Sequence, residues 1–295
     1  TTASGQDSTA MGYNTTASGE DSTAMGLETI ASGDTATAMG ILTNASGNFS
    51  TAMGDKTTAS GDGSTSMGFQ TTASGEDSTA MGINTTASGD YSTAMGYTTK
   101  ASGESSTAMG KKTIASKFVS TAMGAATTAS GDYSTAMGLD TTAFGEASTA
   151  MGKSTKANNK YSTAMGVETI ASGYASTSMG RNTEASGRSA TAMGEYNKID
   201  SASLFVVGNG TDSERNNAFE VKDNGIIIGN ANNMTVDNIN LLDILDIINK
   251  QEQQIDLLLK YIYPMQSCNC SVGLLQCDNV SHVVDSYKTL NQCGL

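Results

Sequence analysis

The amino-acid sequence predicts an all-β solenoid, a parallel β-roll, over residues 1–196, and three observations predict this fold. First, one unit of approximate sequence T-x-A-S-G-x-x-S-T-A-M-G-x-x is written fourteen times, with no residue gained or lost. Second, Gly occupies repeat positions 5 and 12 in nearly every copy. Third, the segments between these glycines are rich in Ala, Ser and Thr and contain no Pro. A period this strict is typical of solenoids, in which each unit stacks on its neighbour in the same way.

Each repeat is expected to contain two short strands and two tight turns. Positions 1–4 and 8–11 are too short for helices and suit strands. Gly at positions 5 and 12, followed by charged, aromatic and amide residues at positions 6, 7, 13 and 14, suits turns. Lys117 and Asn159 replace the Gly of position 5 in two repeats. Asn159 is expected to keep the turn because Asn enters the left-handed region more easily than other side chains.

The alternation of side chains along a strand assigns the faces of the roll. Position 2 varies among Thr, Ile, Asn, Lys and Glu and is expected to face water, whereas the Ala and Ser of positions 3 and 10 fit a thin interior. A Met does not fit there, so position 11 is expected to form an outward stripe: Met11, Met25, Met39, Met53, Met67, Met81, Met95, Met109, Met123, Met137, Met151, Met165, Met179 and Met193. The alternative is a wider single-chain solenoid with Met inside.

A continuous apolar stripe of this length is rarely left in solvent, so the stripe needs a partner. The simplest partner is the same stripe on identical chains around a symmetry axis. The Met residues are therefore predicted to form the interface of a homo-oligomer.

The unit A-S-G-x-x-S-T-A-M-G resembles the head repeat of trimeric autotransporter adhesins of the Yersinia-adhesin-like type. The segment from Ala31 to Gly40 shows the family's spacing of small residue, Gly, small residue, aliphatic residue and Gly, with Met39 where the family usually has Ile, Leu or Val. The resemblance covers residues 1 to about 230. It implies a left-handed parallel β-roll in which three chains pack side by side, as in bacterial adhesins and also in phage and viral fibres.

Composition and motifs argue against several other classes of protein. The 295 residues contain no Trp and 5% aromatic residues, so no large globular core is expected. A net charge of −13 argues against nucleic-acid binding, which relies on clustered Lys and Arg. No run of eighteen apolar residues predicts a transmembrane helix. With a single His, no G-x-S-x-G elbow and no phosphate loop, the chain is predicted not to be an enzyme and to hold no cofactor or metal.

Residues 197–233 are predicted to form a β-rich cap. The segments 203–207, 218–221 and 226–228 are rich in large apolar residues, and Asp223-Asn224-Gly225 is a favourable hairpin turn between the last two. The cap resembles the segment that often ends such heads in phage and viral fibres.

Residues 234–263 are predicted to form a short trimeric coiled coil. Apolar residues and one Gln follow alternating spacings of three and four, as in a heptad seam: Leu241, Ile244, Ile248, Gln251, Ile255, Leu258 and Ile262. Mostly Ile at a, with Ile, Gln and Leu at d, favours a trimer or tetramer over a dimer. The alternative is one amphipathic helix folded onto its own chain.

Residues 264–295 are predicted to form a tip that holds all four cysteines: Cys268, Cys270, Cys277 and Cys293. Disulfides are expected, within one chain or between chains, and the sequence does not choose among the pairings. A zinc site that uses His282 is an alternative, but the cysteine spacing matches no standard ligand pattern.

The function expected from these features is that of a homotrimeric extracellular fibre. It would project from a virion or a cell and attach to a glycan or protein on a host or neighbouring cell by multivalent contacts. The alternatives are a structural filament that polymerises end to end through the roll, and an ice-binding solenoid. The mixture of Ile, Lys and Glu at position 2 disfavours the latter.

Overall fold

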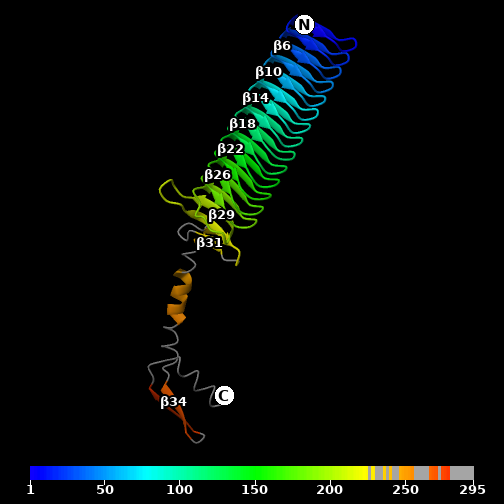
Figure 1. Cartoon of the computed structure of the whole chain (residues 1–295). Helices are drawn as coiled ribbons and strands as arrows, with labels where there is room; N and C mark the ends of the chain where they lie inside the picture. Colours follow the sequence, from blue (N-terminus) through cyan, green and yellow to red (C-terminus); the bar gives the residue numbers. More distant parts are fainter. Residues whose placement is uncertain are drawn as a thin grey trace. The chain divides into compact units, whose positions relative to one another are not determined.

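The computed structural model describes residues 1–224, 227–229, 235–236, 239–240, 246–255, 266–271 and 274–279. The chain forms two compact units, Thr1–Gly229 and Asn230–Leu295, and the first contains all fourteen repeats. Figure 1 shows the repeats of the first unit as rungs stacked in sequence order. The all-β parallel solenoid predicted for residues 1–196 is therefore confirmed.

One sheet of the roll consists of two-residue strands, one from each repeat. These strands pair in parallel with a register of one repeat, so that Thr2 lies opposite Thr16 and Ala3 opposite Ala17. The strands of this fourteen-stranded sheet are β1 (Thr2–Ala3), β3 (Thr16–Ala17), β5 (Ile30–Ala31), β7 (Asn44–Ala45), β9 (Thr58–Ala59), β11 (Thr72–Ala73), β13 (Thr86–Ala87), β15 (Lys100–Ala101), β17 (Ile114–Ala115), β19 (Thr128–Ala129), β21 (Thr142–Ala143), β23 (Lys156–Ala157), β25 (Ile170–Ala171) and β27 (Glu184–Ala185).

The other sheet consists of five-residue strands that cover positions 9–13 of each repeat. They also pair in parallel with a register of one repeat, so that Met11 lies opposite Met25 and Gly12 opposite Gly26. The strands are β2 (Thr9–Tyr13), β4 (Thr23–Leu27), β6 (Thr37–Ile41), β8 (Thr51–Asp55), β10 (Thr65–Phe69), β12 (Thr79–Ile83), β14 (Thr93–Tyr97), β16 (Thr107–Lys111), β18 (Thr121–Ala125), β20 (Thr135–Leu139), β22 (Thr149–Lys153), β24 (Thr163–Val167), β26 (Thr177–Arg181) and β28 (Thr191–Glu195).

Backbone hydrogen bonds join each rung to the next in the strands and also in both turns. In a strand, Thr9 N donates to Ser22 O at 2.8 Å. In the turns the direction reverses: Asp21 N donates to Gln6 O, and Glu28 N donates to Tyr13 O, both at 2.9 Å. The backbone polar groups of a thin roll are thus satisfied by its neighbours in the stack rather than by a thick core.

The strand boundaries differ from those expected, because the first strand is shorter and the second continues through the Gly of position 12. Gly96, at this position, has a φ of +128°, and a Cβ there would lie 2.0 Å from the carbonyl oxygen of Gly110 in the next rung. The same approach recurs along the column. Gly is required at position 12 for two reasons: its φ is positive, and the backbone of the next rung leaves no space for a side chain.

The explanation offered for Asn159 is wrong. Residues at position 5 do not have a positive φ, and Gly is favoured there for lack of space: a Cβ on Gly61 would lie 2.0 Å from the carbonyl oxygen of Gly75. Where a side chain is present, Asn159 N donates to Ser162 Oγ at 3.2 Å, and Lys117 N donates to Ser120 Oγ at 3.1 Å. Gly131 N makes the same hydrogen bond to Ser134 Oγ at 3.1 Å, so the turn is kept without Gly.

The left-handed residues of the roll lie at positions 7 and 14 instead. Twenty-seven non-Gly residues, from Asp7 to Tyr196, have φ between 43° and 59° at these two positions, and even the β-branched Val119 does so, with a φ of 51°. Each non-Gly residue in this region costs about 1–2 kcal/mol relative to a right-handed conformation. The hydrogen bonds between rungs hold both turns in this shape.

The interior is a thin layer of small side chains contributed by both sheets. Ala at positions 3 and 10 is almost completely buried along the roll, together with Thr at position 1 and Ser at position 8. Most of the position 1 hydroxyls have no hydrogen-bond partner, but Ser66 and Ser178, which replace Ala at position 10, reach Thr71 and Thr183 at 2.7 and 2.8 Å. The predicted interior of Ala, Ser and Thr is confirmed.

After the last repeat, three further strands extend the sheet of five-residue strands. Strand β29 (Ser203–Asn209) pairs in parallel with β28, and β30 (Asn217–Lys222) and β31 (Ile227–Gly229) follow in antiparallel order. The strands on either side of the turn predicted at 223–225 are therefore paired, and Gly225 of that turn lies outside the described residues. In β29, Val206 follows the interior column of Ala192 and is 3% exposed, whereas Phe205 and Val207 follow the outward columns of Thr191 and Met193. The rings of Phe205 and Phe219 lie 6.0 Å apart.

A buried polar cluster links β29, β30 and the segment before β29. The carboxylate of Glu220, which is 6% exposed, accepts hydrogen bonds from Ser203 and from Asn217 Nδ2, and it lies 3.0 Å from Lys222 Nζ. Lys222 also pairs with Asp200. Burial raises the pKa of Glu220, but hydrogen bonds from Ser203, Asn217 and Lys222 outweigh burial and hold this pKa below its ordinary value. A hydrogen bond from Lys222 likewise lowers the pKa of Asp200.

The described residues of the second unit form two strand pairs and a helix. Strands β32 (Thr235–Val236) and β33 (Ile239–Asn240) are antiparallel, as are β34 (Gln266–Ser271) and β35 (Leu274–Asn279). Residues 246–255 are helical. Helix therefore does not extend over the whole of the predicted coiled-coil segment 234–263, because strands form its first part.

We expect Gly96→Ala to destabilise the roll by about 2 kcal/mol or more, because it adds a clash with Gly110 O to an unfavourable φ. Gly63→Asn is the matched control, since other rungs carry non-Gly residues at position 7 and the Cβ would meet only the flexible Asp77 side chain. Thermal unfolding by circular dichroism measures both. Equal losses for the two variants would contradict the assigned role of position 12.

The polar cluster should make the end of the roll sensitive to acid. Because the pKa values of Glu220 and Asp200 are lowered on folding, their contribution is present above the ordinary carboxylate range, near 4, and is lost as pH falls through the lowered values. Glu220→Gln should therefore lower Tm at pH 7, with the difference from the wild type shrinking at pH 3. A constant difference across this range would exclude the ionised carboxylate as the cause.

Candidate functional site

The Met residues of position 11 form one continuous stripe on the long-strand sheet. Each Met lies directly opposite the Met of the next rung in the parallel sheet, as Met81 lies opposite Met95. Met11, on the first rung, is 54% exposed, and the other thirteen are partly buried. The Ala before each Met is buried on the opposite face, so the structure places the Met side chains outside the interior of the roll. The alternative of a wider roll with Met inside is therefore wrong for this chain.

A column of Thr at position 9 accompanies the Met stripe. Alternation along the strand puts positions 9 and 11 on the same face, and these Thr side chains are partly buried like the Met residues. Cross-strand neighbours in a parallel stack are close, so each Met shields the next along the column. The result is a narrow, flat and largely apolar face with Thr along one side.

A second apolar column follows the Met stripe along the first seven rungs, and the sequence analysis missed it. Position 13 was expected to belong to a turn, but it ends the long strand and stacks in register, as with Phe69 and Ile83. Six of its first seven residues are large, apolar and exposed: Tyr13, Leu27, Ile41, Phe69, Ile83 and Tyr97. In the last seven rungs the column includes Lys111, Lys153, Arg181 and Glu195. The run of large apolar residues at position 13 in the first seven repeats was the sequence signal that could have identified this column.

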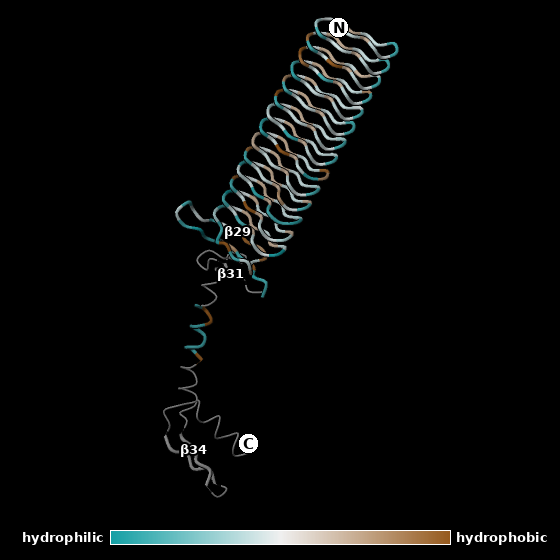
Figure 2. Tube along the Cα trace, viewed as in Figure 1, coloured by the Kyte–Doolittle hydropathy of each residue, from teal (hydrophilic) through white to brown (hydrophobic). Residues whose placement is uncertain are grey.

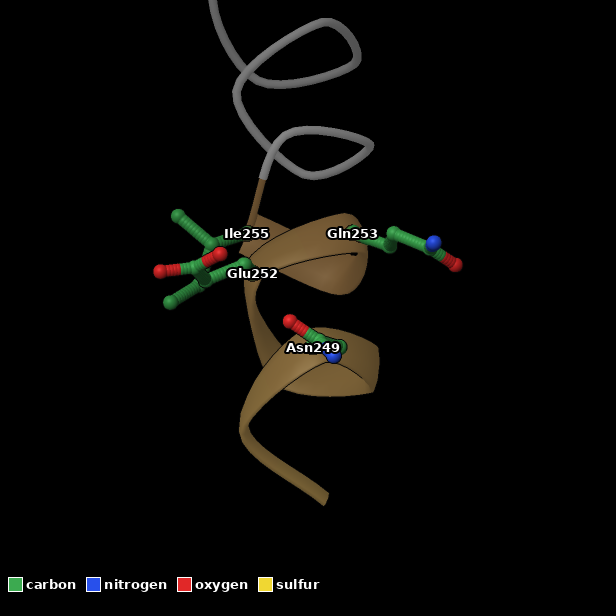
Figure 3. Close-up of a pocket in the computed structure, with 4 residues that line it drawn as sticks. All are labelled: Asn249, Glu252, Gln253 and Ile255. Atoms are coloured by element: carbon green, nitrogen blue, oxygen red, sulfur yellow. The ribbon is translucent and has the colours of Figure 1, made fainter. Parts of the chain in front are cut away.

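The helical segment of the second unit also exposes apolar side chains. Ile248 and Ile255, from the predicted heptad seam, are 45% and 55% exposed, and Gln251 between them is exposed. Figure 3 shows Glu252 and Ile255 projecting from one side of this helix and Gln253 from the other. The seam residues Leu241, Ile244, Leu258 and Ile262 lie outside the described residues.

Three of the four cysteines lie in described strands. Cys268 and Cys270 lie in β34, Cys277 lies in β35, and the register puts Cys268 opposite Cys277. Cys293 and His282 lie outside the described residues, so the predicted disulfides and the alternative zinc site both involve positions beyond them. Among the residues that the structure describes, no group of three or more His, Cys, Asp or Glu side chains is arranged to hold a metal ion.

The comparisons with known proteins point to one family. A family model described as the YadA head domain repeat, two copies long, matches residues 3–29, 31–57, 59–85, 87–113, 115–141, 143–169 and 171–195. The matches abut across almost the whole roll and share its fourteen-residue pitch. No curated protein matches the sequence. In the part of the chain that the structure describes, no helix is long and apolar enough to span a bilayer.

Proposed function

The chain belongs to the YadA head-repeat family of adhesin-like surface fibres, and from this premise we propose that it acts as a homotrimer that attaches to a host or neighbouring surface. The observation that carries the proposal is the Met stripe of the roll. A fold whose interior needs only Ala, Ser and Thr has no structural use for fourteen aligned Met side chains on its outside. Contact between the Met stripes of identical chains would account for these side chains.

The energetics favour association along the stripe. Burying an apolar side chain of this size contributes about 1.5–3 kcal/mol, and less where it is already partly covered. Summed over a column of this length, even a fraction of that value exceeds the usual cost of bringing chains together. Because the stripe is straight and in register, sister chains aligned in parallel would match Met to Met along the whole roll.

The helix supports three as the number of chains. Ile248 and Ile255 are exposed in the single chain and fall seven residues apart, with Gln251 between them. Ile at position a favours two strands when Leu occupies every d position, but here the d positions are Ile, Gln and Leu. This mixture favours more than two strands, and a buried Gln would fix the register. We therefore assign a trimeric coiled coil to the part of 234–263 that follows β33, with the seam Leu241, Ile244, Ile248, Gln251, Ile255, Leu258 and Ile262.

The remaining assignments complete a fibre. The roll would be left-handed, as the family resemblance implies, and residues 197–233 would cap it with the bulky side chains of β29 and β30. Residues 264–295 would form a tip in which Cys268, Cys270, Cys277 and Cys293 make disulfides, and the facing positions of Cys268 and Cys277 in β34 and β35 favour that pair. Disulfides agree with an extracellular location, on a virion or on a cell.

Assembly through the stripe is tested by Met95→Asp, which places a charge in the centre of the proposed interface. We expect the variant to shift the soluble chain from trimer toward monomer in light-scattering mass measurements. Thr86→Asp, on the outer face of the short-strand sheet, is the matched control and should leave the trimer intact. A monomeric wild type, or equal effects of the two variants, would contradict the interface.

Attachment is tested with the soluble trimer itself. Fluorescently labelled trimer should bind host or neighbouring cells in a saturable manner, and the monomeric Met95→Asp variant should bind at least tenfold more weakly because three linked copies raise avidity. Concentration-dependent filaments under the electron microscope, with no cell binding, would favour a structural filament instead.

A further inference from the structure

One edge of the roll changes its chemistry part way along. This edge consists of the turns at positions 4–8, which connect each short strand to the following long strand. In the first eight rungs it carries nine carboxylates and no Lys or Arg: Asp7, Glu20, Asp21, Asp34, Asp62, Glu76, Asp77, Asp90 and Glu104. Figure 2 shows that hydrophilic residues predominate at the turns of the roll.

From the ninth rung on, exposed aromatic rings replace the carboxylates as the main feature of this edge. Five successive rungs contribute one ring each: Phe118, Tyr133, Phe144, Tyr161 and Tyr174, which are 38%, 55%, 64%, 49% and 39% exposed. The same rungs and the next one bring the only basic residues of the edge, Lys117, Lys160 and Arg188. We call these rings and cations the aromatic edge.

Four of the five rings of the aromatic edge pack in pairs. Phe118 and Tyr133 pack edge to face with centroids 5.3 Å apart, and Tyr161 and Tyr174 do so at 5.5 Å. The Arg188 guanidinium lies 4.9 Å from the centre of the Tyr174 ring. Aromatic pairs and cation–π contacts of this geometry are stabilising, and a ring fixed before binding loses little entropy when a partner arrives.

The polar groups between the rings restrict the class of partner. Lys160 forms an ion pair with Glu146 at 2.7 Å, and Asp132, Asn158 and Asn159 lie in the same turns. A lipid surface would have to desolvate these carboxylates, and a nucleic acid would meet them with few cations in return. A saccharide suits the mixture, because a pyranose has apolar C–H faces that stack on rings and hydroxyl edges that bond carboxylates and amides.

The spacing of the rungs adds a geometric argument. Successive rungs are about 4.8 Å apart, which is comparable to the length of one sugar unit in an extended saccharide chain. Charge complementarity limits where such a chain can lie, since the carboxylates of the first eight rungs would repel any saccharide that carries acidic groups. On the aromatic edge Lys117 and Arg188 stand at opposite ends of the row of rings.

We propose that the aromatic edge binds a linear saccharide chain, neutral or carboxylated, laid along the axis of the roll with its sugar rings against Phe118, Tyr133, Phe144, Tyr161 and Tyr174. This inference rests on the attachment function proposed above and names the class of its ligand. Neighbouring rungs supply both the stacking surface and the hydrogen-bonding groups, so an interrupted or branched chain would bind less well than a linear one.

The test is binding of the full-length trimer to an array of linear oligosaccharides, neutral and uronate-containing. We expect micromolar or weaker binding per site, and at least a tenfold loss, equivalent to about 1.4 kcal/mol, in the triple variant Tyr133→Ala, Tyr161→Ala, Tyr174→Ala. The matched control replaces Phe49 and Tyr91, the exposed rings of the acidic rungs, by Ala and should bind normally. Tyr161→Phe, which keeps the ring, should also bind normally. Unchanged melting curves establish that the variants fold.

The outcomes separate this inference from the attachment function. If the trimer binds cells but no oligosaccharide, or if the triple variant binds oligosaccharides and cells as the wild type does, the aromatic edge is not the site and attachment stands. If the wild type binds oligosaccharides in a manner that requires these rings yet binds no cell, the saccharide site stands and the attachment function fails.

Discussion

The contact of one rung's backbone with the next is the constraint on which the rest of this structure depends. At positions 5 and 12 successive glycines approach so closely that a methyl group would meet a carbonyl oxygen at about 2 Å. This contact forces every rung to repeat the path of the one before. Columns of like residues follow directly, because a residue can only stack on the residue fourteen positions away. The Ala interior, the Met stripe and the paired turns are all consequences of that registration.

The same constraint divides the surface between stability and interaction. The strands are confined to small residues inside and to Thr and Met outside, so variation between repeats is concentrated at positions 2, 6, 7, 13 and 14. Positions 7 and 14 accept Asp, Tyr, Val or Lys even though their backbone is left-handed, since hydrogen bonds between rungs impose the conformation. A sequence of this kind can change its edges without changing its fold. The acidic and aromatic halves of one edge illustrate this freedom.

Much of the roll was predictable because comparison among fourteen copies separates packed columns from solvated ones. The Ala interior and the outward Met stripe followed from size and alternation alone. The role of Gly12 and its equivalents did not, because the distance between rungs is known only once they are stacked. The apolar column that contains Leu27 and Ile83 was missed because position 13 was expected to lie in a turn. The rings of the aromatic edge were not recognised as one feature because they occupy different repeat positions. Ile248, Gln251 and Ile255 lie on the predicted helix, whereas the other four seam residues lie outside the described residues.

Because the rungs are evenly spaced, the number of repeats determines the length of the roll. Because every rung joins its neighbours through identical registers, excising or duplicating one whole fourteen-residue unit would shorten or lengthen the roll by about 4.8 Å and leave the continuity of every column intact. Loss of a single residue, in contrast, would turn Ala outward and Met inward in one rung. The reach of such a roll can therefore change only in discrete steps of one repeat.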